Sequence, residues 1–278
     1  SVIRNFSTNT NTGAIGNGSQ QPNSVAGAFG LDLDASGNFL YVAGTSQIDG
    51  FGVSGGVLTR LAGFPISPPG LVGGWRMKIS NNNAFLFVTD DTANQVVGYT
   101  INANTGALTL IPGSPFASGL AQTNDLELSA NDSFLYVTSD DGNMNGFSVA
   151  AGTGVLTPLG GGFPIAINGG LAGNSCGMLA HNGNLYVSDP SLNSTDAFAI
   201  AANGALTRLN GFPIGGGGCG PVLASNNASA LAPIYFAGFN TNQILGFNPA
   251  AGGALTAAPG SPTAAGANGP ASMGIFVR

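Results

Sequence analysis

The chain has 278 residues, of which 46 are glycine, 43% are hydrophobic and only 6% are charged. This apolar content suffices for a buried core, whereas the glycines exclude long helices because each interior glycine costs about 1 kcal/mol relative to alanine. Six lysines and arginines against twelve aspartates and glutamates give a net charge of −6. Since no basic stripe is available to neutralise phosphates, we do not expect nucleic acid as a partner.

An internal repeat runs from one end of the chain to the other. An aromatic residue, in most copies preceded by glycine, is followed by a turn of the Gly-x-Leu-Thr type, and the pattern returns every 45 to 51 residues. The aromatic residues are Phe6, Phe51, Tyr99, Phe147, Phe198 and Phe247. A period in this range, filled with short apolar runs and glycine-rich turns, is typical of four-stranded propeller blades. The sequence therefore predicts an all-β, six-bladed β-propeller.

Because the repeat leaves no room for a linker, we expect one domain over residues 1–278. The last blade should combine both ends of the chain. The predicted blades are residues 27–66, 74–116, 123–165, 174–214, 219–262, and 270–278 together with 1–16.

The third repeat shows the predicted unit most clearly. Residues 125–128 alternate as strand A, and the apolar residues 134–137 form strand B. Strand C covers residues 145–149, and a glycine-rich turn leads to strand D at residues 155–159. A proline then marks the connection to the next blade in five repeats: Pro65, Pro115, Pro164, Pro213 and Pro262.

These repeats resemble the YVTN-type, lactonase-like β-propeller repeat, in which strand B reads Gly-x-x-Leu-Tyr-Val and strand D follows Thr-Gly-x-Leu-Thr. The matching residues are 37–42, 104–109 and 204–207. The resemblance covers nearly the whole chain and implies the propeller fold. It implies no single function, because the family joins enzymes that open sugar lactones with surface and binding proteins. Many of its members have seven blades, whereas we count six.

The two ends of the chain are expected to share the sixth blade. Residues 5–6 and 13–15 match strands C and D, residues 272–277 match strand A, and nothing matches strand B. The N-terminal strand could shift inward, the sequence could lack a segment, or a strand from another molecule could fill the gap. The residues that strand addition would use are Ser1, Val2, Ile3, Arg4, Asn5, Phe6, Met273, Gly274, Ile275, Phe276, Val277 and Arg278.

Alignment of the A strands predicts a charge network near the central channel. Asp32, Lys78 and Glu127 occupy one equivalent position in three consecutive blades, and Arg76 and Asp125 lie two residues earlier. Alternating charge around neighbouring strands is typical of ion pairs that align blades, and a ligand site in the channel is the alternative.

Carboxylates follow strand B in three successive blades, where they should gather on one face. They are Asp90, Asp91, Asp140, Asp141 and Asp189. Carboxylate oxygens suit calcium, but aspartate is also an ordinary turn former and no EF-hand spacing is present. We favour the turn role and expect no cofactor, with calcium as the alternative.

Several features of the sequence indicate an exported protein. Cys176 and Cys219 lie near the start of the same strand in neighbouring repeats, so they could form a disulfide between blades or stay as buried thiols. No apolar run is long enough to span a bilayer, and the chain begins at Ser1, as a processed export product or an artificially trimmed chain would. Glycan acceptor triplets begin at Asn5, Asn17, Asn131, Asn193 and Asn227. We expect a secreted or extracellular surface protein.

Catalytic candidates are scarce. His181, Glu127 and Lys78 are each the only residue of their type, and His181 falls in a predicted turn. A lactonase would gather His, Glu and Arg side chains near the channel, and matching repeats offer no such set. We interpret the chain as a non-enzymatic structural or adhesive surface protein whose self-association at the termini could build a filament. The alternatives are a lactonase-like hydrolase with a site at the channel mouth, and a carbohydrate- or calcium-binding module.

Overall fold

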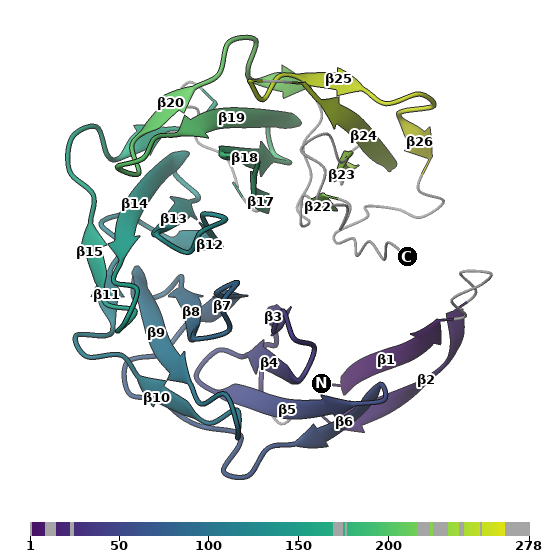
Figure 1. The fold of residues 1–278 in the computed structure, drawn as a ribbon, viewed down its shortest axis with the longest axis vertical. Coiled ribbons are helices and arrows are strands. Elements are labelled where there is room, and N and C mark those ends of the chain that lie inside the picture. Colours follow the sequence, from purple (N-terminus) through teal and green to yellow (C-terminus); the bar gives the residue numbers. More distant parts are fainter. Residues whose placement is uncertain are drawn as a thin grey trace. The chain divides into compact units, whose positions relative to one another are not determined.

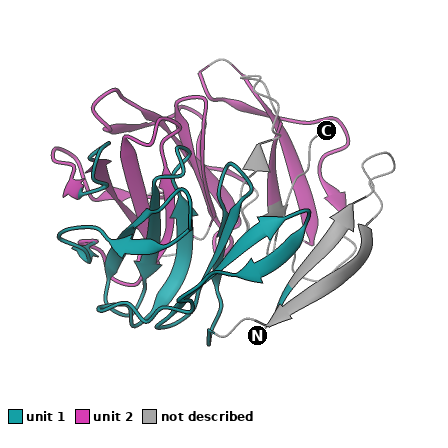
Figure 2. Ribbon diagram, turned by 60° about the horizontal axis from the view of Figure 1, so that its bottom comes forward, with its two compact units in different colours: residues 1–117, 150–155, 278 teal, residues 118–149, 156–277 magenta. Residues whose placement is uncertain are grey.

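The computed structural model describes most of the chain: residues 2–8, 15–22, 25–168, 175, 177–215, 223–224, 233–238, 242–250 and 252–264. These residues form strands and turns, and no helix among them could cross a membrane. The chain divides into two compact units, coloured teal and magenta in Figure 2. Unit 1 holds residues 1–117, 150–155 and 278, and unit 2 holds residues 118–149 and 156–277.

Unit 1 contains three antiparallel sheets, labelled in Figure 1. The first is the pair β1 (Val2–Thr8) and β2 (Ile15–Pro22). The second runs in the order β3 (Gly30–Leu33), β4 (Phe39–Ala43), β5 (Ile48–Ser54) and β6 (Val57–Arg60). The third runs in the order β7 (Gly74–Ile79), β8 (Phe85–Asp90), β9 (Gln95–Ile101) and β10 (Leu108–Leu110), with β11 (Phe116–Ala117) also pairing with β9.

Unit 2 repeats this plan three times. The first sheet runs in the order β12 (Thr123–Leu128), β13 (Phe134–Ser139), β14 (Asn143–Val149) and β15 (Leu156–Pro158), with β16 (Ile165–Ala166) as its short last strand. The second runs in the order β17 (Gly177–His181), β18 (Asn184–Asp189), β19 (Ser194–Ile200) and β20 (Leu206–Arg208), with β21 (Ile214–Gly215). The third runs in the order β22 (Leu223–Ala224), β23 (Ile234–Gly238), β24 (Gln243–Pro249) and β25 (Leu255–Ala257), with β26 (Thr263–Ala264). In every sheet the short last strand pairs with strand C.

The A-B-C-D order predicted from the third repeat is therefore present in five consecutive repeats, and the all-β prediction is confirmed. Each connection proline follows a cis peptide bond. The single domain and the count of six blades stay predictions, because the two compact units are defined separately.

Strand B supplies the core between sheets of the same unit. Three of its tyrosines are fully buried and donate their hydroxyl to a glycine carbonyl in the C–D turn of the following sheet: Tyr41 to Gly106 at 2.7 Å, Tyr136 to Gly204 at 2.9 Å, and Tyr186 to Gly253 at 3.1 Å. Gly106 has a φ of 69°, and a Cβ there would lie 2.7 Å from a ring carbon of Phe39. The glycine of the repeated turn is thus required by both conformation and packing.

The N-terminal strands pair as the predicted outer half of a blade requires, with Phe6 opposite Gly18. Ile3 of β1 is buried in a cluster that includes Val25 and Phe51, which attaches β1 to the sheet of β3–β6. Residues 265–278 lie outside the described residues, and with them the predicted strand A at residues 272–277. The three alternatives for the sixth blade therefore stay open.

Candidate functional site

Strand A carries charged residues at one repeated register position. Asp32 lies opposite Tyr41, Lys78 opposite Phe87, and Glu127 opposite Tyr136. The aromatic partner is in each case the same residue of strand B. The structure thus places these three residues at equivalent positions, two of them in unit 1 and Glu127 in unit 2.

Asp32 links the A strands of the two larger sheets in unit 1. Its Oδ2 accepts a hydrogen bond from the Ile79 backbone N–H of β7 at 2.8 Å, and its Oδ1 accepts one from the Leu33 N–H at 3.0 Å. Burial raises the pKa of the Asp32 carboxyl above its ordinary value, while the positive charge of Lys78 lowers it. A partly desolvated carboxylate therefore lies within the electrostatic influence of a cation, an arrangement that suits acid–base chemistry.

Arg76 lies on a bulge of β7, where the register shifts between Gly74 and Met77. Its backbone N–H donates to Thr89 Oγ1 at 3.0 Å, and its Nη1 donates to the Phe29 carbonyl at 3.4 Å. The buried Nε finds no partner within the described structure. Bulges of this kind redirect side chains next to active sites, and this one presents a guanidinium group with spare donor capacity.

The equivalent region of unit 2 holds carboxylates instead. Asp125 lies on a bulge of β12, and its N–H donates to Thr138 Oγ1 at 3.3 Å. Glu127 is buried, and its Oε1 accepts a hydrogen bond from the Leu128 N–H at 3.2 Å. The predicted charge network across these strands stays a prediction, because its cations belong to unit 1 and two of its carboxylates to unit 2.

His181 lies at the end of β17, in a tight hairpin. Asn182 and Gly183 form its two-residue turn, and both have positive φ, as a type I′ turn requires. The imidazole Nε2 lies 2.8 Å from Asn182 Nδ2. The ring is half-buried beside a cavity of about 380 Å³ that Asn131 and Phe134 also line, and burial lowers the pKa of His181. The turn was predicted, whereas the cavity was not.

The carboxylates that follow strand B differ in their surroundings. Asp90 is buried and accepts hydrogen bonds on both oxygens, from Ala93 N–H on Oδ1 at 2.9 Å and from Val72 N–H on Oδ2 at 2.8 Å. Asp91 accepts a hydrogen bond from the Thr92 hydroxyl at 2.9 Å. Both carboxylates shape the turn after β8, which is the role that the sequence favours.

The corresponding turns of unit 2 hold the other three. Asp140 accepts a hydrogen bond from Asn124 Nδ2 at 2.6 Å, and Asp141 accepts bonds from the Ser139 hydroxyl and the Asn143 N–H. Asp189 is buried at the end of β18. Across the described part of the chain, no three aspartate, glutamate, histidine or cysteine side chains come together as a metal site.

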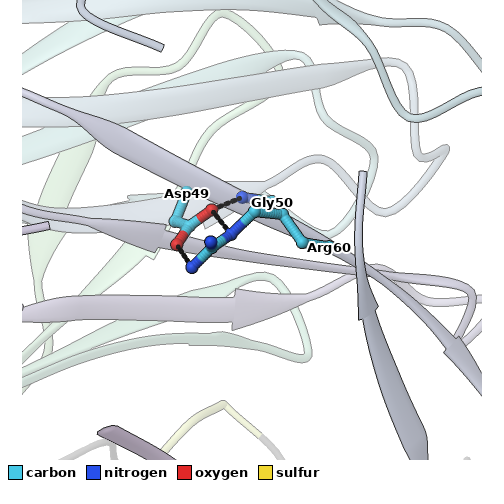
Figure 3. A network of polar contacts seen from close by, with 3 residues as sticks. All are labelled: Asp49, Gly50 and Arg60. Atoms are coloured by element: carbon cyan, nitrogen blue, oxygen red, sulfur yellow. Dashed lines mark hydrogen bonds and ion pairs between the residues drawn. The ribbon is translucent and has the colours of Figure 1, made fainter. Parts of the chain in front are cut away.

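Two ion pairs that sequence reasoning missed stabilise strands C and D. In Figure 3, Arg60 of β6 reaches Asp49 of β5, with Nη2 and Oδ2 2.9 Å apart, and the Gly50 N–H donates to the same carboxylate. In unit 2, Arg208 and Asp196 form the same pair at 2.7 Å. Each guanidinium carbon also lies 5.5 Å from the centre of the phenylalanine ring two residues after the aspartate. The sequence signal that could have predicted these pairs is an Asp-x-Phe motif in strand C followed by an arginine in strand D.

Several predicted sites cannot be placed. Cys176 and Cys219, and hence the predicted disulfide, lie outside the described residues. The same holds for Ser1 and for Met273, Gly274, Ile275, Phe276, Val277 and Arg278 of the predicted assembly surface. Val2, Ile3, Arg4, Asn5 and Phe6 belong to β1.

Comparison with known proteins identifies the family. Residues 23–166 match the family model described as lactonase, seven-bladed β-propeller. None of the curated proteins compared matches the chain.

Solved structures confirm the propeller fold. A candidate 6-phosphogluconolactonase of Bacteroides fragilis has a TM-score of 0.75 at 18% identity, with 98% of this chain and 79% of that chain covered. A second, from Bacteroides uniformis, has a TM-score of 0.77 at 16% identity, with 97% and 80% covered. A periplasmic gluconolactonase of Pseudomonas aeruginosa has a TM-score of 0.67 at 20% identity, with 93% and 77% covered.

The family match overturns the interpretation of this chain as a non-enzymatic structural or adhesive protein. The prediction of a self-assembling filament subunit, and that of a protein without enzyme activity, are wrong for the same reason. The non-enzyme prediction rested on the small number of ionisable side chains, whereas the filament prediction rested on the missing strand B, the low surface charge and the expected export. The structure instead places a partly buried carboxylate, Asp32, within the electrostatic influence of Lys78. The match covers more than half of the chain, so the chain belongs to the lactonase family of seven-bladed β-propellers.

Proposed function

We propose that the chain is a lactonase-like hydrolase that opens the cyclic ester of a sugar lactone at the A strands of unit 1. The family match over residues 23–166 is the observation that carries this reaction class. The similar structures named as gluconolactonases and 6-phosphogluconolactonases support a sugar lactone as the substrate. Asp32, Lys78 and Arg76 all lie inside the matched stretch.

These residues have the properties that lactone opening needs. Asp32 accepts a proton from water as the water oxygen adds to the ring carbonyl carbon, and the carbonyl oxygen becomes negatively charged. Lys78 and Arg76 stabilise that charge. The ring C–O bond then breaks, and Asp32 returns the proton to the departing ring oxygen, which leaves an open-chain hydroxy acid.

Aromatic side chains next to Arg76 favour a ring-shaped substrate. The rings of Phe29 and Trp75 lie 4.2 Å apart between their centres, and Phe29 is exposed. Arg76 reaches the carbonyl of this same Phe29. Aromatic side chains combined with a few polar groups are typical of small-molecule sites.

Hydrolysis of gluconolactone by the purified chain tests the proposal, with the spontaneous rate subtracted. Asp32→Asn should lower kcat by about 100-fold or more, because a general base contributes at least this factor. Asp91→Asn, which removes a charge from a turn of the same unit, should leave kcat unchanged. Absence of turnover by the folded wild-type chain would contradict the proposal, as would equal loss in both variants.

The pH dependence of kcat gives a second test of Asp32. The base works ionised, and burial raises its pKa above 3.8, so the rate should fall with decreasing pH at a higher pH than for an ordinary aspartate. Lys78→Met removes the charge that lowers the pKa of Asp32, so it should move this acid limb to still higher pH. If the acid limb of kcat does not move in Lys78→Met, the group that titrates there is not Asp32.

We also propose that the chain acts outside the cytoplasm. The periplasmic gluconolactonase of Pseudomonas aeruginosa among the similar structures supports this location. Fractionation of the producing cells, followed by immunodetection, tests it, and recovery from the cytosol alone would contradict it.

A further inference from the structure

Asp189 is a buried carboxylate with one unused oxygen. It ends β18 and is only 1% exposed. Its Oδ1 accepts a hydrogen bond from the Leu192 N–H at 3.1 Å, whereas its Oδ2 has no hydrogen-bond partner in the described structure. A buried charged oxygen without a partner is costly, which makes it a place to look for a ligand.

Ser194 places a second unused oxygen on the same face. It pairs directly with Asp189 in the β18–β19 ladder, so the two side chains extend from neighbouring Cβ atoms. The Ser194 hydroxyl is buried and also lacks a partner among the described residues. In unit 1 the equivalent pair is Asp90 and Gln95, where Gln95 Nε2 approaches Asp90 Oδ2 at 3.4 Å. Serine is too short to make this contact.

Asn168 completes the group. Its backbone N–H donates to Asp196 Oδ2 at 2.9 Å, which fixes its position, yet both atoms of its side-chain amide are buried and unpartnered within the described structure. The residue is 6% exposed and has a φ of 52°. Its side-chain amide approaches Asp189 as a hydrogen-bond donor, which lowers the pKa of that carboxyl, but it does not reach full hydrogen-bond distance.

The local charge favours a cation. Asp140 lies close enough to Asp189 that its negative charge raises the pKa of the Asp189 carboxyl, a smaller effect than that of burial. The neighbouring Arg208 is engaged by Asp196, with Nη2 and Oδ2 2.7 Å apart, and this Asp196 oxygen also accepts the Asn168 N–H. Asp189 is buried and Asp140 is partly buried, and neighbouring carboxylates in a desolvated site favour a bound metal ion.

We propose that Asp189 Oδ2, Asn168 Oδ1 and Ser194 Oγ bind a divalent cation of the calcium class, with Asp140 supplying further negative charge. All three are oxygen ligands, which calcium prefers, and they combine carboxylate, amide and hydroxyl groups as calcium sites do. Magnesium fits less well, because it demands near-octahedral geometry and keeps most of its waters. The site is independent of the proposed lactonase chemistry, since it belongs to unit 2.

Calcium binding to the full chain tests the site. After dialysis against a chelator, titration with calcium chloride in a calorimeter should show one site that depends on Asp189. Saturating calcium should raise Tm by about 5 °C or more, because a ligand at 100 times its Kd stabilises a protein of this size by that amount. Magnesium chloride should give a smaller rise.

Three variants separate this site from other carboxylates. Asp189→Asn and Asn168→Gly should each abolish the calcium-induced rise in Tm; glycine keeps the positive φ of position 168 and removes only the amide. Asp90→Asn is the matched control: its Tm starts lower, but calcium should raise it as in the wild type. A wild-type chain that does not respond to calcium, or a response retained in both Asp189→Asn and Asn168→Gly, overturns the proposal.

Discussion

Asp90 and Asp189 occupy the same place in two repeats and have different surroundings. Each ends strand B, pairs with the residue five positions later and accepts a hydrogen bond from the N–H three positions later. Asp90 Oδ2 also accepts from the Val72 N–H, whereas Asp189 Oδ2 has no partner among the described residues. A repeated residue therefore does not imply a repeated role, because the partners that satisfy a buried carboxylate come from other segments.

Removal of the Asp90 carboxylate, which accepts hydrogen bonds on both oxygens, should lower the free energy of unfolding most. Asp90→Ala leaves the N–H groups of Val72 and Ala93 without their acceptor inside unit 1. We expect a loss of about 2–4 kcal/mol in the free energy of unfolding, measured by urea denaturation. Asp91→Ala, which removes the bond from the Thr92 hydroxyl, should change the free energy of unfolding by less than about 0.5 kcal/mol. Similar losses in the two variants would show that the bonds to Asp90 contribute little.

Giving Asp189 the partner that Asp90 has should change the free energy of unfolding by an intermediate amount. Ser194→Gln places an amide donor opposite Asp189, as Gln95 is placed opposite Asp90. Without calcium we expect a gain of about 1.5 kcal/mol, the size of a hydrogen bond to a charged group. The same variant should lose the calcium-induced rise in Tm, since the amide occupies the site. Ser194→Ala is the control and should show no gain; a gain of equal size there would mean that removing the hydroxyl, not adding the donor, stabilises the turn.

Giving Asp90 the serine partner that Asp189 has should change the free energy of unfolding least. Gln95→Ser removes the amide bonds to Asp90 and to the Gly70 carbonyl, and we expect a loss of about 1 kcal/mol by urea denaturation. No calcium site should form, because the Val72 N–H still occupies Asp90 Oδ2. Calcium binding that depended on Asp90 in this variant would show that the residue opposite the carboxylate is enough to determine whether calcium binds.

Much of the fold could be predicted because its signals are local. The alternation of residues 125–128 and the glycine-rich turns identified strands A to D, and counting along the repeat placed Asp32, Lys78 and Glu127 at one register position. The raised pKa of Asp32 could not be predicted, because it results from burial against a neighbouring sheet. The absence of a repeated set of ionisable residues therefore pointed to a non-enzymatic protein, which the family match corrected.

The sequence by itself determined the strand order within each blade and the glycine at each C–D turn, since period, alternation and turn chemistry act over a few residues. Only the tertiary structure decided which polar atoms are satisfied. Asn168 approaches Asp189 from a different segment without completing a hydrogen bond, and Ser194 fails to reach it across the ladder because its side chain is short. Such partnerships depend on packing between distant segments, and packing is where otherwise similar repeats acquire different chemistry.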